Sequence, residues 1–311
     1  MNAVRPPLRA LLADYLTVRR ALGFKLAAVG RILGQFVDFL EDAGIDTVTV
    51  DAALAFAQMP DPDSTNWPAI RLSAVRRFAI WLRGIDPACQ VPSARLLRHG
   101  PDRATPYLYS PQQIDDLLTQ AGRLRPALRA ATYQTLIGTL ASSGIRIGEA
   151  IALDDADLDV ERSLLIIREA KFGKSRLVPL HATALTAVAA YRELREASVR
   201  RQCPALFVST VGTRLHHSNI TLTYHRLTAA AGITPRSDTC RPRIHDLRHS
   251  FAVATVLDWY AAGADVPAML PRLATFLGHT DPKHTYWYLS AAPELMVAAA
   301  DRLDAYLDGA P

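Results

Sequence analysis

In the last quarter of the chain, residues 241–252 read R-P-R-I-H-D-L-R-H-S-F-A. The spacing of apolar residues predicts a helix over residues 244–260. On that helix His245 and Arg248 are three residues apart and share a face, and His249 falls close by. A packed helical domain does not otherwise need these polar side chains, so we interpret the segment as part of a functional site.

Two other interpretations of this segment are open. Histidines four residues apart can bind zinc, but a zinc-protease helix reads H-E-x-x-H, whereas here Asp246 replaces the glutamate and the positive Arg248 would lie beside the metal. Alternatively, His245 or His249 is an ordinary core histidine whose nitrogens are satisfied. We expect neither a metal nor a cofactor.

A second segment, residues 141–153, reads A-S-S-G-I-R-I-G-E-A-I-A-L. The S-S-G run ends one helix, and Arg146 opens the next, three residues before Glu149. An arginine at a rigid helix start, beside unpaired backbone N–H groups, favours an anion. The alternative is a surface arginine paired with Glu149.

A third segment carries an unusual concentration of lysine. Short β-prone runs at 164–169 and 176–180 predict a hairpin whose tip holds Lys171, Lys174 and Arg176. Only four of the 35 basic residues are lysines, so two at one turn indicate a task that arginine does not perform. Lysine releases a proton in a desolvated site, whereas guanidinium does not. The alternative is a solvated basic turn.

The fourth segment, residues 277–290, reads L-G-H-T-D-P-K-H-T-Y-W-Y-L-S. It contains His279 and two tyrosines, Tyr286 and Tyr288. On a helix these tyrosines point about 200° apart and cannot both face one site. One of the two is then functional and the other is a core residue. Taken alone, either tyrosine would more commonly be a core residue whose hydroxyl is hydrogen-bonded.

The first part of the chain is predicted to be a small helical domain over residues 1–95. Apolar residues recur at helical spacing in three stretches, 8–22, 29–40 and 67–82. The last of these is rich in arginine, and Arg71, Arg76 and Arg77 are the residues that we expect to contact a polyanion.

A proline-rich stretch over residues 96–106 is typical of a linker. It leads into a second, α-rich domain over residues 107–311, which begins with Ser110 as a helix cap. An amphipathic helix over 293–308 ends this domain. The other helices that we expect in it cover residues 112–121, 128–142, 182–197, 219–231, 244–260 and 271–277.

Composition narrows the class of protein. The chain has 311 residues, 50% of them apolar and 21% charged, which is typical of a compact soluble protein. No apolar run reaches the roughly 18 residues of a membrane span, and Arg5, Arg9 and Asp14 interrupt any signal peptide. Three distant cysteines favour a reducing cytoplasmic location. The net charge of +5 permits a polyanionic partner.

Together the four segments supply the groups needed to attack a phosphodiester without a metal. Arginine forks neutralise the nonbridging oxygens while charge builds in the transition state. A tyrosine hydroxyl attacks phosphorus, a lysine protonates the departing 5′ oxygen, and a histidine orients the nucleophile or accepts its proton. A covalent tyrosine keeps the phosphoester energy available for rejoining the strand.

The order of these segments resembles the tyrosine recombinase (phage integrase) family. The first box of that family, G-x-R-x-x-E, and its hairpin pattern K-x-R-x-V-P-L both occur here. They are followed in order by H-x-L-R-H-S-F-A and L-G-H, with a tyrosine nine residues beyond the last histidine. The matching residues are Gly144, Arg146, Glu149, Lys171, Lys174, Arg176, His245, Arg248, His249, His279 and Tyr288.

This resemblance implies a site and a mainly α fold. The catalytic residues would be Arg146, Lys171, His245, Arg248, His279 and Tyr288, supported by Glu149 and His249. Tyr286 is the alternative nucleophile. The fold would be an amino-terminal helical core-binding (SAM-like) domain that clamps DNA, followed by a catalytic domain with a small sheet, as in DNA breaking-rejoining enzymes. Besides the three arginines of the first domain, we expect DNA contacts from Lys174, Arg176, Arg241 and Arg243.

The resemblance also implies partners and a function. The partner would be double-stranded DNA carrying a specific recombination site, bound by a homotetramer or by an assembly with related recombinases. The function would be site-specific recombination, as the integrase or transposase of a mobile element. The alternatives are an Xer-type resolvase of chromosome or plasmid dimers, a type IB topoisomerase, and an inactive DNA-binding accessory protein.

Overall fold

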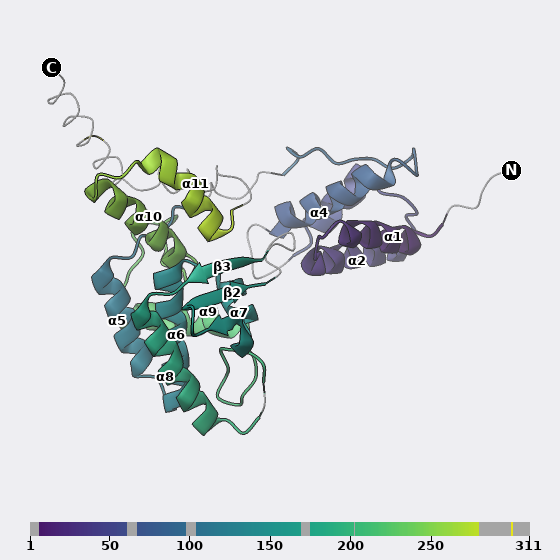
Figure 1. Ribbon diagram of the computed structural model, residues 1–311. Coiled ribbons are helices and arrows are strands. Elements are labelled where there is room, and N and C mark those ends of the chain that lie inside the picture. The colour runs from purple at the N-terminus through teal and green to yellow at the C-terminus, as the bar shows by residue number, and fades with distance from the viewer. Residues whose placement is uncertain are drawn as a thin grey trace, which may run out of the picture. The chain divides into compact units, whose positions relative to one another are not determined.

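Helices make up most of the part of the chain that the computed structural model describes (Figure 1), which is residues 6–60, 67–97, 104–168, 175–201, 203–279 and 300. The chain divides into two units, Met1–Arg103 and Ala104–Pro311. The division falls within the stretch where the sequence predicts a linker. Each unit has hydrophobic clusters of its own.

The first unit is helical throughout its regular structure. Its helices in the described residues are α1 (Leu8–Ala21), α2 (Ala27–Asp42), α3 (Val50–Ala57) and α4 (Trp67–Leu82). The apolar stripe of α2 buries Phe36, and α4 buries Phe78, whose ring lies 5.4 Å from that of Tyr15. The short α3 is held at its start by Thr49, whose side-chain oxygen accepts from the backbone N–H of Ala52.

The second unit combines helices with a small sheet. Its helices are α5 (Pro111–Gly122), α6 (Ala127–Ser143), α7 (Ile147–Ala152), α8 (Ala182–Ser198), α9 (His217–Ala230), α10 (Asp246–Ala261) and α11 (Val266–Leu277), with a 3₁₀ turn η1 (Asp155–Asp157). Ser110 caps α5 as predicted, and Gln113 returns the bond in a capping box. The mainly α fold with a small sheet is therefore confirmed.

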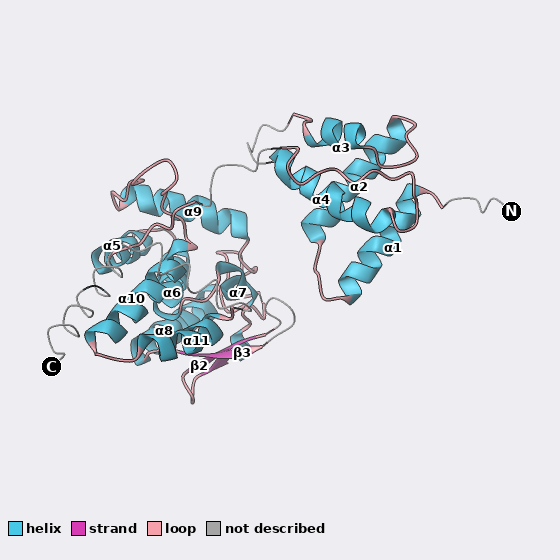
Figure 2. Cartoon of the chain, turned by 90° about the horizontal axis from the view of Figure 1, so that it is seen from above, coloured by secondary structure: helices cyan, strands magenta, loops and turns pink. Residues whose placement is uncertain are grey.

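The sheet is antiparallel, with strand order β1 (Leu158–Asp159), β2 (Leu164–Ile167) and β3 (Arg176–Pro179). The predicted hairpin is the pair β2–β3, in which Leu165 lies opposite Val178 and both are fully buried. Strand β1 adds two residues to β2. Figure 2 shows β3 beside α11, against which it packs.

Helix α6 lies at the centre of this unit and packs against α5, α8 and α10 (Figure 1). Because it is surrounded, it buries residues on most of its circumference, including Leu136 and Ile137. Two of its buried hydroxyls bond within the helix: Thr132 donates to the carbonyl of Leu128, and Ser143 donates to that of Thr139. The helix therefore provides a rigid base for the residues that follow it.

One helix begins earlier than the sequence predicts. The expected helix over 271–277 is the second half of α11, which starts at Val266 and continues through Pro271. Asp265 caps it by accepting from the N–H of Ala268 at 3.2 Å. Pro271 lies in the middle of the helix, where it removes one i→i−4 backbone hydrogen bond, and the helix continues through it. In the part of the chain that the structure describes, no helix is long and apolar enough to cross a membrane.

Candidate active site

The site begins where α6 ends. Gly144 terminates the helix in the left-handed conformation, with φ +60°. A Cβ at this position would lie 2.5 Å from Cδ1 of Phe251 and 3.1 Å from Cδ2 of Leu277. Only glycine combines this backbone angle with such close neighbours. The turn places Arg146 at the cap position of α7.

Arg146 and Glu149 form a closed pair at the start of α7. One oxygen of Glu149 accepts from the backbone N–H of Arg146 at 2.8 Å, and the other accepts from its Nη1 at 2.9 Å. The Nη2 of Arg146 donates to the carbonyl of Gly278 at 3.1 Å. The side chain of Arg146 keeps 29% of its surface exposed, so the guanidinium is fixed and still accessible. The pairing with Glu149 expected for a surface arginine is present, but it is part of a larger arrangement.

Arg248, on α10, is the most deeply buried arginine of the site, with 2% of its surface exposed. Its Nη1 donates to the carbonyl of Gly144 at 2.7 Å, and its Nη2 donates to that of Leu277 at 2.5 Å. The same Nη2 lies 2.9 Å from Nε2 of His279. Arg248 therefore joins the end of α6 to the end of α11.

A third arginine, Arg176 at the start of β3, enters the same place. Its Nη1 and Nη2 donate to the two oxygens of Glu149 at 3.0 and 2.7 Å, and its Nε donates to the carbonyl of Phe276 at 2.9 Å. Arg146, Arg176, Arg248 and Glu149 form what we call the arginine cluster. Three cations and one anion give this cluster a formal charge of +2.

The cluster is organised around the carboxyl end of α11. The last carbonyls of a helix have no partner inside it and carry the negative end of the helix dipole. Here the carbonyls of Phe276, Leu277 and Gly278 accept from the three arginines. Gly278, with φ +67°, ends the helix, and His279 follows directly. The geometry thus brings the predicted residues Arg146, Glu149, Arg176, Arg248 and His279 to one turn.

Glu149 keeps its charge in this setting. Burial raises the pKa of its carboxyl, but hydrogen bonds from Arg176 and the backbone of Arg146, together with both positive charges, outweigh burial and lower the pKa to about 2. The carboxylate is therefore ionised throughout the neutral range.

The two histidines of α10 differ in environment. His245 is exposed at the start of the helix, three residues before Arg248, whereas His249 is buried. Their rings lie edge to face with centroids 5.1 Å apart. Among the described residues, no three His, Cys, Asp or Glu side chains lie close enough to hold a metal ion, so the pair has no third donor there.

Asp246 is a structural residue of the site that the sequence did not single out. It is fully buried and accepts from the backbone N–H, Nε and Nη2 of Arg243 at 2.9–3.1 Å. Burial raises the pKa of Asp246, and the bonds from Arg243 oppose that rise. An acid at the first position of a helix, three residues after an arginine, is the signal that could have revealed it.

Several predicted residues lie outside the described part of the chain. They are Lys171, Lys174, Tyr286, Tyr288 and all but one residue of the helix expected over 293–308. For these the sequence predictions stand as predictions.

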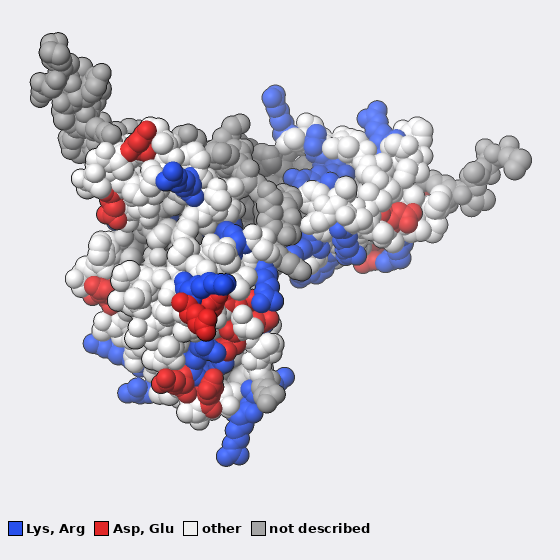
Figure 3. Space-filling view, in the orientation of Figure 1, with Lys and Arg blue, Asp and Glu red and all other residues white. Residues whose placement is uncertain are grey.

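The predicted DNA contacts of the first unit lie on α4. Arg77 is exposed, whereas Arg71 is partly buried, donates to the carbonyl of Met59 at 2.8 Å and lies over the ring of Phe56. Figure 3 shows Lys and Arg side chains spread over the visible face of this unit, with few acids among them. In the second unit Arg241 is exposed beside Asp238, and Arg243 is held by Asp246. Their contact with DNA stays a prediction.

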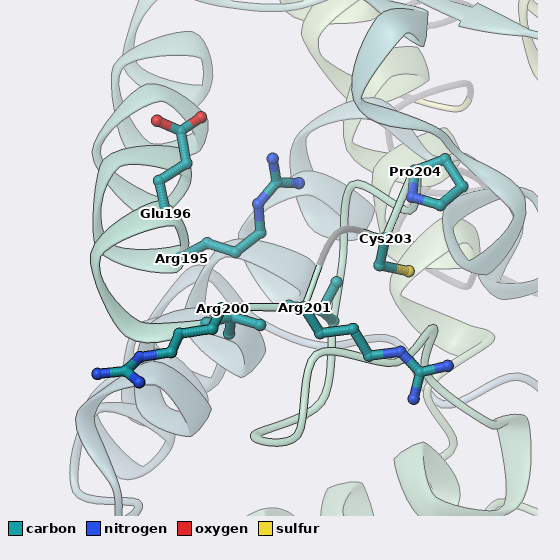
Figure 4. Close-up of a pocket in the computed structure, with 8 residues that line it drawn as sticks. Arg195, Glu196, Arg200, Arg201, Cys203 and Pro204 are labelled. Atoms are coloured by element: carbon teal, nitrogen blue, oxygen red, sulfur yellow. The ribbon is translucent and has the colours of Figure 1, made fainter.

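A large hollow of about 640 Å³ lies elsewhere, where the segment after α8 folds back. In Figure 4 the guanidinium groups of Arg200 and Arg201 point away from each other, and Cys203 lies near them. Arg195 is already engaged with the carbonyls of Ala205 and Leu206. These cations do not converge on one point, so the hollow lacks the arrangement found in the arginine cluster.

The sequence has close relatives among known proteins. Residues 109–294 match the sequence model of the phage integrase family. A protein of Sinorhizobium fredii named as integrase/recombinase y4rB is 41% identical over 303 residues, which cover 95% of this chain and 96% of the relative. Tyrosine recombinase XerD of Caulobacter vibrioides is 31% identical over 284 residues, covering 89% of this chain and 88% of the relative.

A solved structure shares the fold. The Tn1549 transposon integrase, solved in complex with transposon right end DNA, aligns with a TM-score of 0.65 at 16% sequence identity. The alignment covers 96% of this chain and 100% of that chain. The likeness therefore extends over both units.

Proposed function

This chain belongs to the phage integrase family of tyrosine recombinases, and we propose that it cuts and rejoins DNA at a specific site through a covalent bond between Tyr288 and a 3′ phosphate. The family that the sequence motifs resemble is therefore the family to which the chain belongs. One observation carries the proposal: Arg146 and Arg248 donate to the adjacent carbonyls of Gly278 and Leu277. In this proposal the two guanidiniums, which reach neighbouring carbonyls at the end of α11, bind one phosphate.

The reaction is a transfer of one phosphoester bond. The phenolic oxygen of Tyr288 attacks phosphorus, the bond from phosphorus to the 5′ oxygen breaks, and the DNA 3′ end stays on the protein. Lys171 gives its proton to the departing 5′ oxygen, while His245 orients the phenol or accepts its proton. Rejoining reverses these steps with a 5′ hydroxyl as the nucleophile, so no external energy source is needed.

The charge of the arginine cluster suits this transition state. Negative charge grows on the nonbridging oxygens as phosphorus becomes five-coordinate, and fixed donors in a water-poor site stabilise it most. Arg248 is buried and held by backbone carbonyls, and Glu149 removes only one of the three positive charges. In this proposal His279, whose Nε2 accepts from Nη2 of Arg248, adds a further donor through its Nδ1–H.

The two units have different roles in this proposal. We assign DNA clamping to residues 1–95, through Arg71, Arg76 and Arg77, and catalysis to residues 107–311. A tetramer on two synapsed DNA sites, linked through the helix over 293–308, would perform complete exchange. The exposure of Arg77, the partial exposure of Arg71 and Arg76 and the Lys and Arg side chains on the visible face of this unit (Figure 3) support the first of these assignments.

Within the family we favour a mobile-element integrase over an Xer-type resolvase. The relative named as an integrase/recombinase is 41% identical, against 31% for the XerD relative. A topoisomerase of type IB would share the cleavage chemistry without pairing two sites. An inactive accessory protein is disfavoured because each expected polar position of the site is filled in this sequence.

The test traps the covalent intermediate. The full chain is incubated with a library of duplexes that have randomised arms and a nick just 3′ to the cleavage position. Cleavage then releases a short strand that diffuses away and leaves the protein on the 3′ end. We expect adducts that survive denaturant and disappear after protease treatment, and their sequences identify the target site.

The nucleophile is assigned with two matched variants. Tyr288→Phe should give no adduct, whereas Tyr286→Phe should retain it. Adduct formation by Tyr288→Phe and its loss in Tyr286→Phe would move the nucleophile to Tyr286. Failure of the unaltered chain to form an adduct with any duplex of the library would contradict the proposed function.

A further inference from the structure

We propose that Arg176 is a positioning residue that holds Glu149, and through it Arg146, and that it does not bind DNA. The sequence places Arg176 beside a basic hairpin tip, where a phosphate contact is the simplest expectation. The inference rests on the proposed function, because the orientation of Arg146 matters to catalysis only if that residue binds the reacting phosphate.

Arg176 is mainly engaged inside the protein. Its side chain is 12% exposed, and three of its five N–H donors bond to protein acceptors. Two of them donate to the carboxylate of Glu149 as a fork, and the third donates to the carbonyl of Phe276. The charge of Arg176 is therefore paired with a carboxylate, whereas Arg248 donates to carbonyls, which are neutral.

Glu149 is shared equally between two arginines. Its Oε1 accepts from Nη1 of Arg146 at 2.9 Å and from Nη1 of Arg176 at 3.0 Å. Its Oε2 accepts from the backbone N–H of Arg146 at 2.8 Å and from Nη2 of Arg176 at 2.7 Å. Without Arg176 this buried carboxylate would keep Arg146 as its only charged partner in the cluster. It would then draw Arg146 away from a bound phosphate or take up a proton.

Arg176 also supports the turn that Arg146 touches. A Cβ on Gly278 would come within 2.8 Å of Nη1 of Arg176, so the guanidinium packs directly against this glycine. The carbonyl of Gly278 is the acceptor for Nη2 of Arg146. Arg176 therefore constrains Arg146 through two contacts. It holds Glu149, which binds Arg146, and it packs against Gly278, whose carbonyl accepts from Arg146.

Two substitutions separate positioning from DNA binding. Arg176→Lys keeps the charge but loses the planar fork, and Arg176→Gln loses both. The probe is the nicked duplex recovered from the library, with single-turnover cleavage and equilibrium binding measured over a range of salt concentrations. If Arg176 positions Arg146, both variants should cleave about 100-fold more slowly, because small displacements of catalytic groups cost about this much.

Binding provides the contrast. A positioning role leaves the affinity and its salt dependence unchanged in both variants. A phosphate contact instead predicts that Arg176→Lys cleaves as the unaltered chain does, and that Arg176→Gln lowers the slope of log affinity against log salt by about 0.9. Either of these two results overturns the inference.

The pH profile adds a measurement that a merely structural role would not change. Arg176 is the strongest of the groups that lower the pKa of Glu149. In Arg176→Gln this lowering is lost and the pKa of Glu149 rises, so cleavage should decline at a higher pH than in the unaltered chain. An unchanged profile counts against the inference.

Three controls complete the design. Arg162→Gln removes an exposed arginine of the same sheet that is paired with Asp159, and it should cleave normally. If Arg176→Gln does not fold, Arg176→Lys and Glu149→Gln carry the test, and the double variant Arg176→Lys/Glu149→Gln should be no slower than the slower single variant. No adduct with the unaltered chain overturns the proposed function, whereas a normal adduct with normal cleavage by Arg176→Lys overturns only this inference.

Discussion

Arg248 holds the fold together with the same guanidinium that we propose for catalysis. A buried guanidinium is tolerated only when its donors are satisfied, and here the carbonyls of Gly144 and Leu277 satisfy them. Arg146 uses a similar arrangement nearer the surface. The two arginines should therefore contribute alike to catalysis and differently to stability.

We expect Arg248→Ala and Arg146→Ala each to slow single-turnover cleavage by about 10²–10³-fold, the usual loss of one fixed donor to a transition-state oxyanion. Arg248→Ala should also lower the free energy of unfolding by about 1–3 kcal/mol, because it leaves two buried carbonyls without their donors. Arg146→Ala should lower it less. Urea unfolding followed by circular dichroism checks this, and equal stability of the two variants would contradict it.

Glu149 should give the unfolding free energy a measurable dependence on pH. The pKa of Glu149 is about 2 in the folded chain against an ordinary value of 4.5, so the unfolded state binds the proton more readily. The stabilisation that ionised Glu149 gives to the folded chain is fully present above pH 4.5 and is lost as the pH falls toward 2. At most about 3 kcal/mol of unfolding free energy is lost in this way.

The measurement compares the unaltered chain with Glu149→Gln between pH 5 and pH 3. The difference in unfolding free energy should shrink as the pH falls, while contributions from Asp246 and other acids cancel between the two chains. A difference that stays constant over this range would show that Glu149 is not ionised preferentially in the folded state.

At the scale of elements, the site depends on how α6 and α11 end. Both helices stop at a glycine with positive φ, Gly144 and Gly278, and both last turns give carbonyls to arginines. A side chain at either position would disturb the backbone and the packing together. Gly148, inside α7, differs because a Cβ there would meet no atom within 4 Å.

These two kinds of glycine predict opposite effects. Gly144→Ala should destabilise the second unit by at least about 1–2 kcal/mol, because the left-handed backbone alone costs that much, and the contact with Phe251 adds to it. Gly148→Ala should stabilise the unit by about 0.5–1 kcal/mol, since alanine favours a helix interior. Thermal unfolding of both variants checks the sign, and a stable Gly144→Ala would argue against the described turn.

Elements with a strong local pattern could be predicted from the sequence, and others could not. The hairpin and most helices show in periodicity and caps, as at Ser110. Strand β1 has two residues, too few for any pattern, and the start of α11 is hidden by prolines within the helix. The site motifs gave the residues but not the partner of Arg176, because Glu149 lies 27 positions away along the chain. The sequence therefore predicted a DNA contact for Arg176 from its charge alone.

At the scale of the whole molecule, the chain has separate hydrophobic cores. Phe78 is fully buried in the first unit and Leu136 in the second. No residue is common to the two cores, so each unit has its own source of hydrophobic stabilisation. We expect the units to unfold in separate transitions.

Calorimetry of three chains tests this expectation. Phe78→Ala should lower only the transition of the first unit, and Leu136→Ala only that of the second, each by about 2–5 kcal/mol in unfolding free energy. The two variants act as controls for each other. A single transition that both substitutions shift would show that the chain unfolds as one cooperative body.

The arginines that we propose for catalysis also bind the carbonyls at the carboxyl end of α11. In a descendant of this chain that no longer recombined DNA, loss of one of these arginines would still leave a helix terminus unsatisfied. The arginines of the cluster should therefore persist after selection for recombination has ceased. An intact set of guanidiniums in a relative is then no proof that the relative is active.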